Sequence, residues 1–369
     1  PLGIELFVMD DGWFGARNSD YGGLGDWSVN EKKLPGGLEA LVPRIRELGM
    51  SFGIWIEPEM VSEDSALYRA PDWALKAPNR PVSRGRSQLV LDFSRREVRD
   101  HVYGEIKQVL SSAEIAYVKW DMNRSLTDIY SIEHAQGKVT YDYVRGVYEF
   151  LERLMHRYPD MLIEGCSGGG GRFDAGMLYY TPQIWCSDNT DAVDRLRIQY
   201  GTSFFYPACA VGSHVSAVPN HQTGRITSLH TRSVVAMAGT FGYEFNPDLL
   251  SKEEKEEIQE QITRYKKYEG LICKGDYYRL SNPFENACAA WAFVSEDREQ
   301  VLLSVVMQEI HGNMTVNYVR LKGLDPNAVY RDAATGICYH GSALMAAGMP
   351  MPVEMGEYRA YQIYMEIVG

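Results

Sequence analysis

Residues 116–123 read AYVKWDMN, an apolar run that ends in polar and acidic side chains. Runs of the same kind recur along the chain, at residues 4–11, 51–59, 161–167, 183–189, 210–216 and 234–246. Helical patterns of apolar residues lie between them. Short apolar runs that alternate with helices are typical of a parallel α/β protein, so these runs predict the strands of a parallel sheet.

Two helix starts carry an explicit sequence signal. Ser94 with Glu97, and Ser251 with Glu254, have the S-x-x-E spacing of a capping box, in which the serine and glutamate side chains each accept a backbone N–H. Both pairs precede stripes of apolar residues at helical spacing. We therefore predict helices that begin at these serines.

The residue pattern changes near residue 280, where apolar residues begin to alternate with polar ones. Two-residue alternation, broken by turns that contain proline and glycine, predicts an antiparallel β domain. We place the boundary after the last helix. This gives a (β/α) domain over residues 1–270 and a small β-sandwich domain over residues 271–369.

Composition argues against several classes of partner. The 37 Lys and Arg against 49 Asp and Glu give a net charge of −12, which repels nucleic-acid phosphates and anionic lipid surfaces. No apolar run approaches the roughly 20 residues that a membrane-spanning helix needs. The six cysteines form no CxxC pair, and a chain this long can be stable without disulfides, so we expect a cytoplasmic protein. The start at Pro1, without a signal-peptide pattern, indicates a fragment or a processed form.

The first two runs end in acidic residues, and in parallel barrels the functional side chains lie at the C-terminal ends of strands. Asp10 and Asp11 are followed by a tryptophan, whose indole face can pack on a sugar while carboxylates accept its hydroxyl hydrogens. A lone Asp-Asp pair is more often a turn or a helix cap. Trp55, Glu57 and Glu59 end the second run, where a buried tryptophan with two solvated acids is an equally good interpretation.

The segment KWDMNR at residues 119–124 is the strongest local signal. Lys119 and Asp121 lie on the same face of an alternating strand, where two charges are costly unless they pair or contact a ligand. We therefore favour a functional role over a structural ion pair. Next to Lys119, the Asp121 carboxylate should stay ionised, as a carboxylate nucleophile requires.

A second candidate acid lies in the segment WCSDNTD at residues 185–191. Asp188 or Asp191 could each cap the following helix, and the position at the strand end favours Asp188 as the catalytic one. Two carboxylates at facing strand ends are what glycoside hydrolysis requires. One acts at the anomeric centre, and the other protonates the departing oxygen.

The glycine-rich segment CSGGGGR at residues 166–172 lacks the Gly-Lys-Ser/Thr of a P-loop and the spacing of a dinucleotide fingerprint. Close approach of the backbone to a neutral ligand is the better interpretation. The eight histidines form no HxH or HExxH motif. We therefore expect neither a catalytic metal nor another cofactor.

Taken together, these segments resemble glycoside hydrolase family 36, the bacterial-type α-galactosidases or melibiases, through essentially the whole chain. The motifs that carry the resemblance are MDDGWFG (9–15), GIWIEPEMV (53–61), KWDMNR (119–124), CxxGxGR (166–172) and WCSDNTD (185–191). The resemblance implies a (β/α)8-type TIM barrel with a small C-terminal antiparallel β domain. The chain opens in what resembles the second barrel strand, so the first β/α unit is expected to be missing from it.

The resemblance also implies a function: a retaining exo-α-galactosidase that removes α-1,6-linked galactose from melibiose- or raffinose-type oligosaccharides. Asp121 would be the nucleophile and Asp188 the acid/base. The implied galactose-binding residues are Asp10, Asp11, Trp55, Arg86, Lys119, Asn123, Cys166, Gly169 and Trp185. Arg86 enters only through the resemblance, because its sequence context alone indicates a surface charge.

Alternatives to this function stay open at the level of sequence. An incomplete barrel leaves sheet edges unpaired, which favours association, so a homo-oligomer is compatible with the sequence. The first alternative function is a galactoside-binding module without turnover. The second, less favoured, is a metal-dependent barrel hydrolase.

Overall fold

The computed structural model of the chain describes residues 2–69, 72–313 and 315–368. The described chain divides into two compact units. The first unit spans Ile4–Trp185, and the second contains the described residues from Cys186 onward. The division therefore falls directly after strand β7 (Gln183–Trp185).

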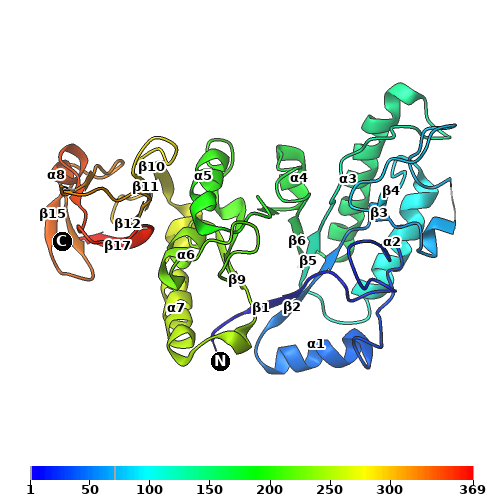
Figure 1. Ribbon diagram of the computed structural model, residues 1–369, viewed down its shortest axis with the longest axis horizontal. Coiled ribbons are helices and arrows are strands. Elements are labelled where there is room, and N and C mark those ends of the chain that lie inside the picture. Colours follow the sequence, from blue (N-terminus) through cyan, green and yellow to red (C-terminus); the bar gives the residue numbers. More distant parts are fainter. Residues whose placement is uncertain (1, 70–71, 314, 369) are drawn as a thin grey trace. The chain divides into compact units, whose positions relative to one another are not determined.

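The first unit is built on parallel strands that follow one another in the sheet in chain order (Figure 1). They are β1 (Leu6–Met9), β2 (Ser51–Ile56), β5 (Tyr117–Trp120), β6 (Leu162–Gly165) and β7. The intervening elements are α1 (Gly37–Glu47), β3 (Met60–Val61), η1 (Leu67–Arg69), β4 (Leu89–Val90), α2 (Arg96–Leu110), η2 (Gln136–Lys138), α3 (Val139–Arg157) and α4 (Ala175–Tyr180). In register, Val118 pairs with Ile54 on one side and Ile163 on the other. The predicted strands of this unit are confirmed, each shorter than its apolar run.

Packing between α3 and β5 fixes the strand end that precedes Asp121. Phe150 on α3 packs edge-on against Trp120, the last residue of β5, with ring centroids 5.2 Å apart. Both side chains are fully buried in the core of the first unit. Because protein interiors are packed about as densely as organic crystals, this contact holds the following residue firmly.

The second unit begins with helices and a parallel strand pair. Its elements are α5 (Ala192–Thr202), η3 (Ala208–Ala210), β8 (Val211–Ser216), α6 (Leu229–Ala236), β9 (Thr240–Glu244), η4 (Pro247–Leu249) and α7 (Lys252–Lys274), with β8 parallel to β9. The capping box predicted at Ser251 is confirmed, because its hydroxyl accepts the Glu254 N–H at 3.1 Å and the Glu254 carboxylate accepts the Ser251 N–H at 2.9 Å. Within the described ranges, none of the helices combines the length and apolar character needed to cross a bilayer.

Two local predictions are wrong. The helix expected at Ser94 starts one residue later, with Arg95 at its N-cap, because the Ser94 hydroxyl donates to Asp92. The run at residues 234–246 is not one strand, since its first residues finish α6 and β9 begins at Thr240. Periodicity alone does not separate a buried helix end from a buried strand.

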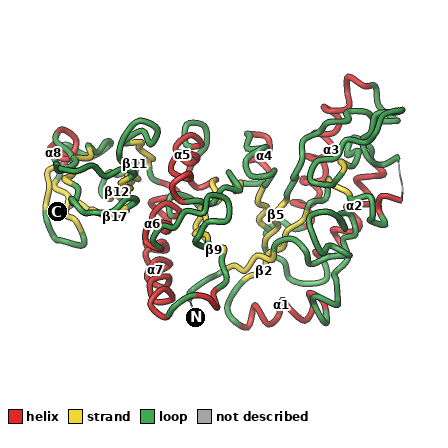
Figure 2. The backbone as a smooth tube through the Cα atoms, in the orientation of Figure 1, coloured by secondary structure: helices red, strands yellow, loops and turns green. Residues whose placement is uncertain are grey.

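The C-terminal region forms the predicted antiparallel β domain (Figure 2). In the described part of the chain, its larger sheet has six strands, in the order β10 (Asp276–Arg279), β11 (Cys288–Val294), β12 (Gln300–Met307), β17 (Arg359–Ile367), β14 (Val329–Asp332) and β15 (Cys338–His340). Strand β13 (Tyr318–Val319) pairs with β16 (Met349–Pro350), and α8 (Gly341–Ala346) lies between β15 and β16 in the chain.

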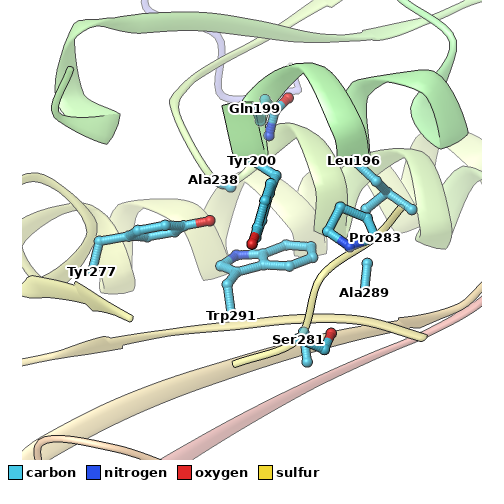
Figure 3. Close-up of a pocket in the computed structure, with 10 residues that line it drawn as sticks. Leu196, Gln199, Tyr200, Ala238, Tyr277, Ser281, Pro283, Ala289 and Trp291 are labelled. Carbon is cyan, nitrogen blue, oxygen red and sulfur yellow. The ribbon is translucent and has the colours of Figure 1, made fainter. Parts of the chain in front are cut away.

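Helices α5 to α7 share a hydrophobic core with this sheet inside the second unit. Leu196 on α5, Leu271 on α7 and Trp291 on β11 belong to one buried cluster. A small cavity of about 20 Å³ remains beside Tyr200, Tyr277 and Trp291 (Figure 3). The common core explains why these helices and the sheet form one compact unit. The predicted boundary between a (β/α) domain ending at residue 270 and a β domain starting at residue 271 stays a prediction.

Candidate active site

The Asp121 carboxylate lies at the C-terminal end of β5, where neighbouring donors hold it. Its Oδ2 accepts the Trp55 indole N–H at 3.1 Å and the Asn123 side-chain amide at 2.8 Å. Its Oδ1 accepts the backbone N–H of Met122 at 2.7 Å. The residue is buried, with 6% of its surface exposed. These donors fix the direction in which the carboxylate oxygens point.

Lys119, on the same strand face, binds Asp10 rather than Asp121. Its Nζ lies 3.0 Å from Asp10 Oδ2 and 5.6 Å from the centroid of the Trp185 ring. Burial alone would lower the pKa of Lys119, but the carboxylates of Asp10 and Glu164 outweigh burial and raise it above its ordinary value. The sequence left open whether Lys119 pairs with a charge or contacts a ligand, and the structure gives Asp10 as its ion-pair partner. The lysine joins the end of β5 to the turn after β1.

The turn after β1 is an ordered part of the site. The Arg17 guanidinium lies 2.8 Å from Asp11 Oδ2. The Trp13 indole N–H donates to the Trp55 carbonyl at 2.9 Å, which ties the turn to the end of β2. Asp10 and Asp11 therefore do not cap a helix, and they lie beside the strand ends that carry Trp55 and Lys119.

Glu59 is a fully buried carboxylate that joins several elements. Its Oε1 accepts the Trp120 indole N–H at 2.8 Å and lies 2.8 Å from Arg172 Nη1. Its Oε2 accepts the Tyr143 hydroxyl at 2.5 Å. The interpretation of Glu57 and Glu59 as solvated acids is wrong, because both residues are 0% exposed.

Glu57 is the buried carboxyl nearest in the chain to Trp55. Its Oε1 accepts the Gln88 side-chain amide at 2.8 Å and also the backbone N–H of Asn123. Burial raises the pKa of Glu57 to about 7, and the charge of Asp121 acts in the same direction. Glu57 therefore carries a proton at mildly acidic pH.

The glycine-rich loop after β6 lies against the segment that carries Asp121. The Cys166 N–H donates to the Trp120 carbonyl at 2.8 Å, and the Ser167 hydroxyl donates to the Met122 carbonyl at 3.0 Å. Gly169 has a φ of 86°, in the left-handed region that favours glycine. This geometry agrees with the close backbone approach inferred for the loop from its sequence.

Arg86 lies on an exposed loop before β4. Its guanidinium is 3.5 Å from the Asp20 carboxylate, and its side chain is 46% exposed. Among the hydrogen bonds of the described residues, none joins Arg86 to the groups around Asp121. Its place in a galactose pocket stays a prediction.

The two acids of the WCSDNTD segment differ in their surroundings, and both lie in the second unit. Asp191 is the N-cap of α5, where its Oδ1 accepts the N–H groups of Val193 and Asp194 at 3.0 Å each. It also pairs with Arg225 and is 2% exposed. Asp188 lies between β7 and α5 and is solvent-exposed. The Asp191 carboxylate thus has a structural role as a helix cap, which favours Asp188 as the catalytic acid/base.

Replacing Asp191 by alanine is expected to destabilise the protein. Loss of the cap costs about 1 kcal/mol, and the cost rises further because Arg225 loses its buried partner. Urea unfolding of Asp191→Ala measures the total loss in the free energy of unfolding from both effects. Asp191→Asn keeps a capping oxygen and should lose less, and equal stability of Asp191→Ala and the parent would contradict the assignment.

Sequence reasoning missed the groups that position the site. Arg17, Gln88 and Tyr143 were not singled out, and Arg172 was named only as part of the CxxGxGR motif, because the role of each depends on a contact that its own segment does not reveal. For Glu57 and Glu59 a signal existed: they share the two-residue spacing of Trp55. Among the described residues, no group of His, Cys, Asp and Glu side chains is arranged to hold a metal ion.

Comparison with known proteins gives a consistent result. The sequence matches the family described as Melibiase over residues 1–275, and the glycosyl hydrolase family 36 C-terminal domain over residues 288–365. It is 63% identical over 362 residues to the bifunctional alpha-galactosidase/sucrose kinase AgaSK of Mediterraneibacter gnavus. This match covers 98% of this chain and 38% of that protein. It is 52% identical over 361 residues to alpha-galactosidase AgaA of Geobacillus stearothermophilus, covering 97% and 49%. The chain thus spans half or less of the length of these relatives.

Solved structures agree over the whole chain. The galactosidase domain of AgaSK has a TM-score of 0.97 at 62% identity, and the match covers 100% of this chain and 50% of that one. A variant of AgaA from Geobacillus stearothermophilus in complex with raffinose has a TM-score of 0.98 at 50% identity, covering 100% and 52%. The predicted fold class, a TIM-type (β/α) barrel with a C-terminal antiparallel β domain, is confirmed.

Proposed function

This chain belongs to the melibiases of glycoside hydrolase family 36, and from that membership we propose that it is a retaining exo-α-galactosidase that needs no cofactor. The observation that carries the proposal is the Asp121 carboxylate, buried at a strand end and aimed by Trp55 and Asn123. A carboxylate fixed in this way suits attack on a sugar's anomeric carbon. The proposed substrates carry terminal α-1,6-linked galactose, as melibiose and raffinose-type oligosaccharides do.

The proposed chemistry is a double displacement. Asp121 attacks the anomeric carbon while the Asp188 carboxyl protonates the departing glycosidic oxygen, which leaves a β-galactosyl ester on Asp121. Asp188, now a carboxylate, removes a proton from water as that water attacks the same carbon and releases the Asp121 carboxylate. Two inversions give net retention of the α-configuration.

The residues proposed to bind galactose are those that the family resemblance implies. The Trp55 and Trp185 indoles offer apolar faces for the C–H groups of a sugar ring. Asp10 supplies an acceptor and Lys119 a donor for hydroxyl groups, and their mutual contact at 3.0 Å keeps both in place. Asp11, Arg86, Asn123, Cys166 and Gly169 complete the proposed set.

The relatives support the substrate class. Structures of AgaA variants were solved in complex with raffinose and with stachyose, at 50% identity to this chain. We propose the same class of α-galactosyl oligosaccharide for this protein. We further propose a cytoplasmic location and no nucleic-acid or membrane partner, in keeping with the net charge of −12.

Hydrolysis of 4-nitrophenyl α-galactoside tests the proposal. The protein should release nitrophenol, and proton NMR at early times should show α-galactose before its β-anomer. Appearance of β-galactose first would refute retention. Binding of galactose without turnover would support the alternative of an inactive binding module.

A further inference from the structure

Glu57 is a buried carboxyl that the double displacement does not use. It follows β2, is 0% exposed, and its Oε1 accepts hydrogen bonds from the Gln88 amide and the Asn123 backbone N–H. Its Oε2 is buried and finds no hydrogen-bond partner among the described residues. A buried ionised carboxylate with one oxygen unpartnered is costly, whereas a protonated carboxyl in that position is much less so.

A short chain of contacts leads from Glu57 to the proposed nucleophile. Glu57 fixes the Asn123 backbone, and the Asn123 side-chain amide donates to Asp121 Oδ2 at 2.8 Å. The charged group that acts on Glu57 is the Asp121 carboxylate, while the contacting Gln88 and Asn123 are neutral. If both carboxyls were ionised, their negative charges would repel each other. The charge of Asp121 therefore favours the state in which Glu57 keeps its proton.

We propose that Glu57, as a neutral carboxyl that carries its proton on Oε2, is a positioning residue that holds Asn123 and thereby orients the Asp121 nucleophile. The inference rests on the proposed function of Asp121. Glu57 touches neither substrate nor reacting atoms in this scheme. Its role is to place an amide donor on Asp121 without adding a second negative charge beside it.

The proposal makes activity depend on pH in a defined direction. Below pH 7 Glu57 is protonated, and the arrangement around Asp121 is intact. As the pH rises through about 7, Glu57 loses its proton and becomes a second buried negative charge that interacts with Asp121. Repulsion then displaces Asn123 and Asp121, so activity falls on the alkaline side.

Two substitutions separate this role from a structural one. Glu57→Gln keeps the accepting oxygen and the neutral charge, whereas Glu57→Leu removes the acceptor. With 2,4-dinitrophenyl α-galactoside, Glu57→Leu should lower kcat roughly 100-fold with little change in KM, as misplacement of a reacting group does. Glu57→Gln should restore most of that loss.

The pH profile is the decisive readout. An activated leaving group needs no acid assistance, so kcat/KM reports the nucleophile and its surroundings in the free enzyme. The parent should lose kcat/KM above pH 7, and Glu57→Gln should hold its value to higher pH. Glu59→Gln is the matched control, because Glu59 is equally buried but bound to Arg172, and its alkaline limb should follow the parent's.

A stability measurement tests the proton on Glu57 without any substrate. A folded-state pKa raised from 4.5 to about 7 means that the folded protein binds a proton that the unfolded chain releases. The melting temperature of the parent relative to Glu57→Gln should therefore fall between pH 4.5 and 7 and level off above. A constant difference, or a Glu57→Gln variant as inactive as Glu57→Leu, would overturn the proposal.

This pair of measurements keeps the two proposals apart. If the protein hydrolyses no α-galactoside, the proposed function fails while the stability curve still reports the state of Glu57. If hydrolysis is normal and the stability difference does not change with pH, the function stands and the inference about Glu57 is wrong.

Discussion

Asp121→Ala lowers turnover of α-galactosides by roughly 10⁴- to 10⁶-fold, the loss expected when an essential nucleophile is removed. The structure gives the reason, because the Trp55, Met122 and Asn123 donors converge on this carboxylate. Alanine leaves a space on the β-face of the anomeric carbon that a small anion can enter. Added azide should then restore turnover of 2,4-dinitrophenyl α-galactoside and yield β-galactosyl azide.

The identity of that azide product makes the test specific. An azide anion that attacks the face vacated by Asp121 forms a carbon–nitrogen bond as dinitrophenolate departs, with one inversion. Asp191→Ala serves as the control, since a residue that caps α5 should give no azide product of either configuration. Residual activity of Asp121→Ala near the parent level would remove Asp121 from the mechanism.

Asp188→Ala should show a dependence on the leaving group that the parent lacks. Hydrolysis of raffinose needs protonation of a sugar alkoxide, and loss of a general acid there costs about 10²- to 10⁴-fold. With 2,4-dinitrophenyl α-galactoside, formation of the ester should be nearly unaffected, so that the intermediate accumulates and a burst appears. Azide should intercept this ester and give α-galactosyl azide by a second inversion.

Formation of β-galactosyl azide by Asp121→Ala and of α-galactosyl azide by Asp188→Ala would identify the nucleophile and the acid/base. If Asp191→Ala, rather than Asp188→Ala, showed the burst and the α-azide, the acid/base assignment would pass to Asp191. The structure argues against this outcome because the Asp191 carboxylate is bound by Val193, Asp194 and Arg225.

The sequence was informative where a signal is local. The parallel strands and their acidic ends follow from short apolar runs, and the capping box at Ser251 follows from a four-residue pattern. It failed where a neighbour distant in sequence decides. Ser94 has the same pattern, but Asp92 takes its hydroxyl, and the helix starts later.

The site shows the same limit. Asp121 was identified from its own strand, yet its donors include Trp55 from another strand. Lys119 was placed near Asp121 because they share a strand face, but its partner could not be identified from the sequence, since Asp10, which provides the counter-charge, is 109 positions away. The interpretation of Glu57 and Glu59 as solvated acids could not be excluded from the sequence, because the partners that allow their burial, Gln88 and Arg172, come from distant loops.

The proposed nucleophile and every residue proposed to bind galactose fall in the first compact unit, while Asp188 falls in the second. In the proposed scheme, recognition of the sugar and protonation of the departing group are therefore encoded in two different stretches of chain. Substitutions around Asp188 would then leave the residues proposed to bind galactose unchanged in sequence. Diversification within such a lineage would then conserve the galactose unit and vary what is attached to it.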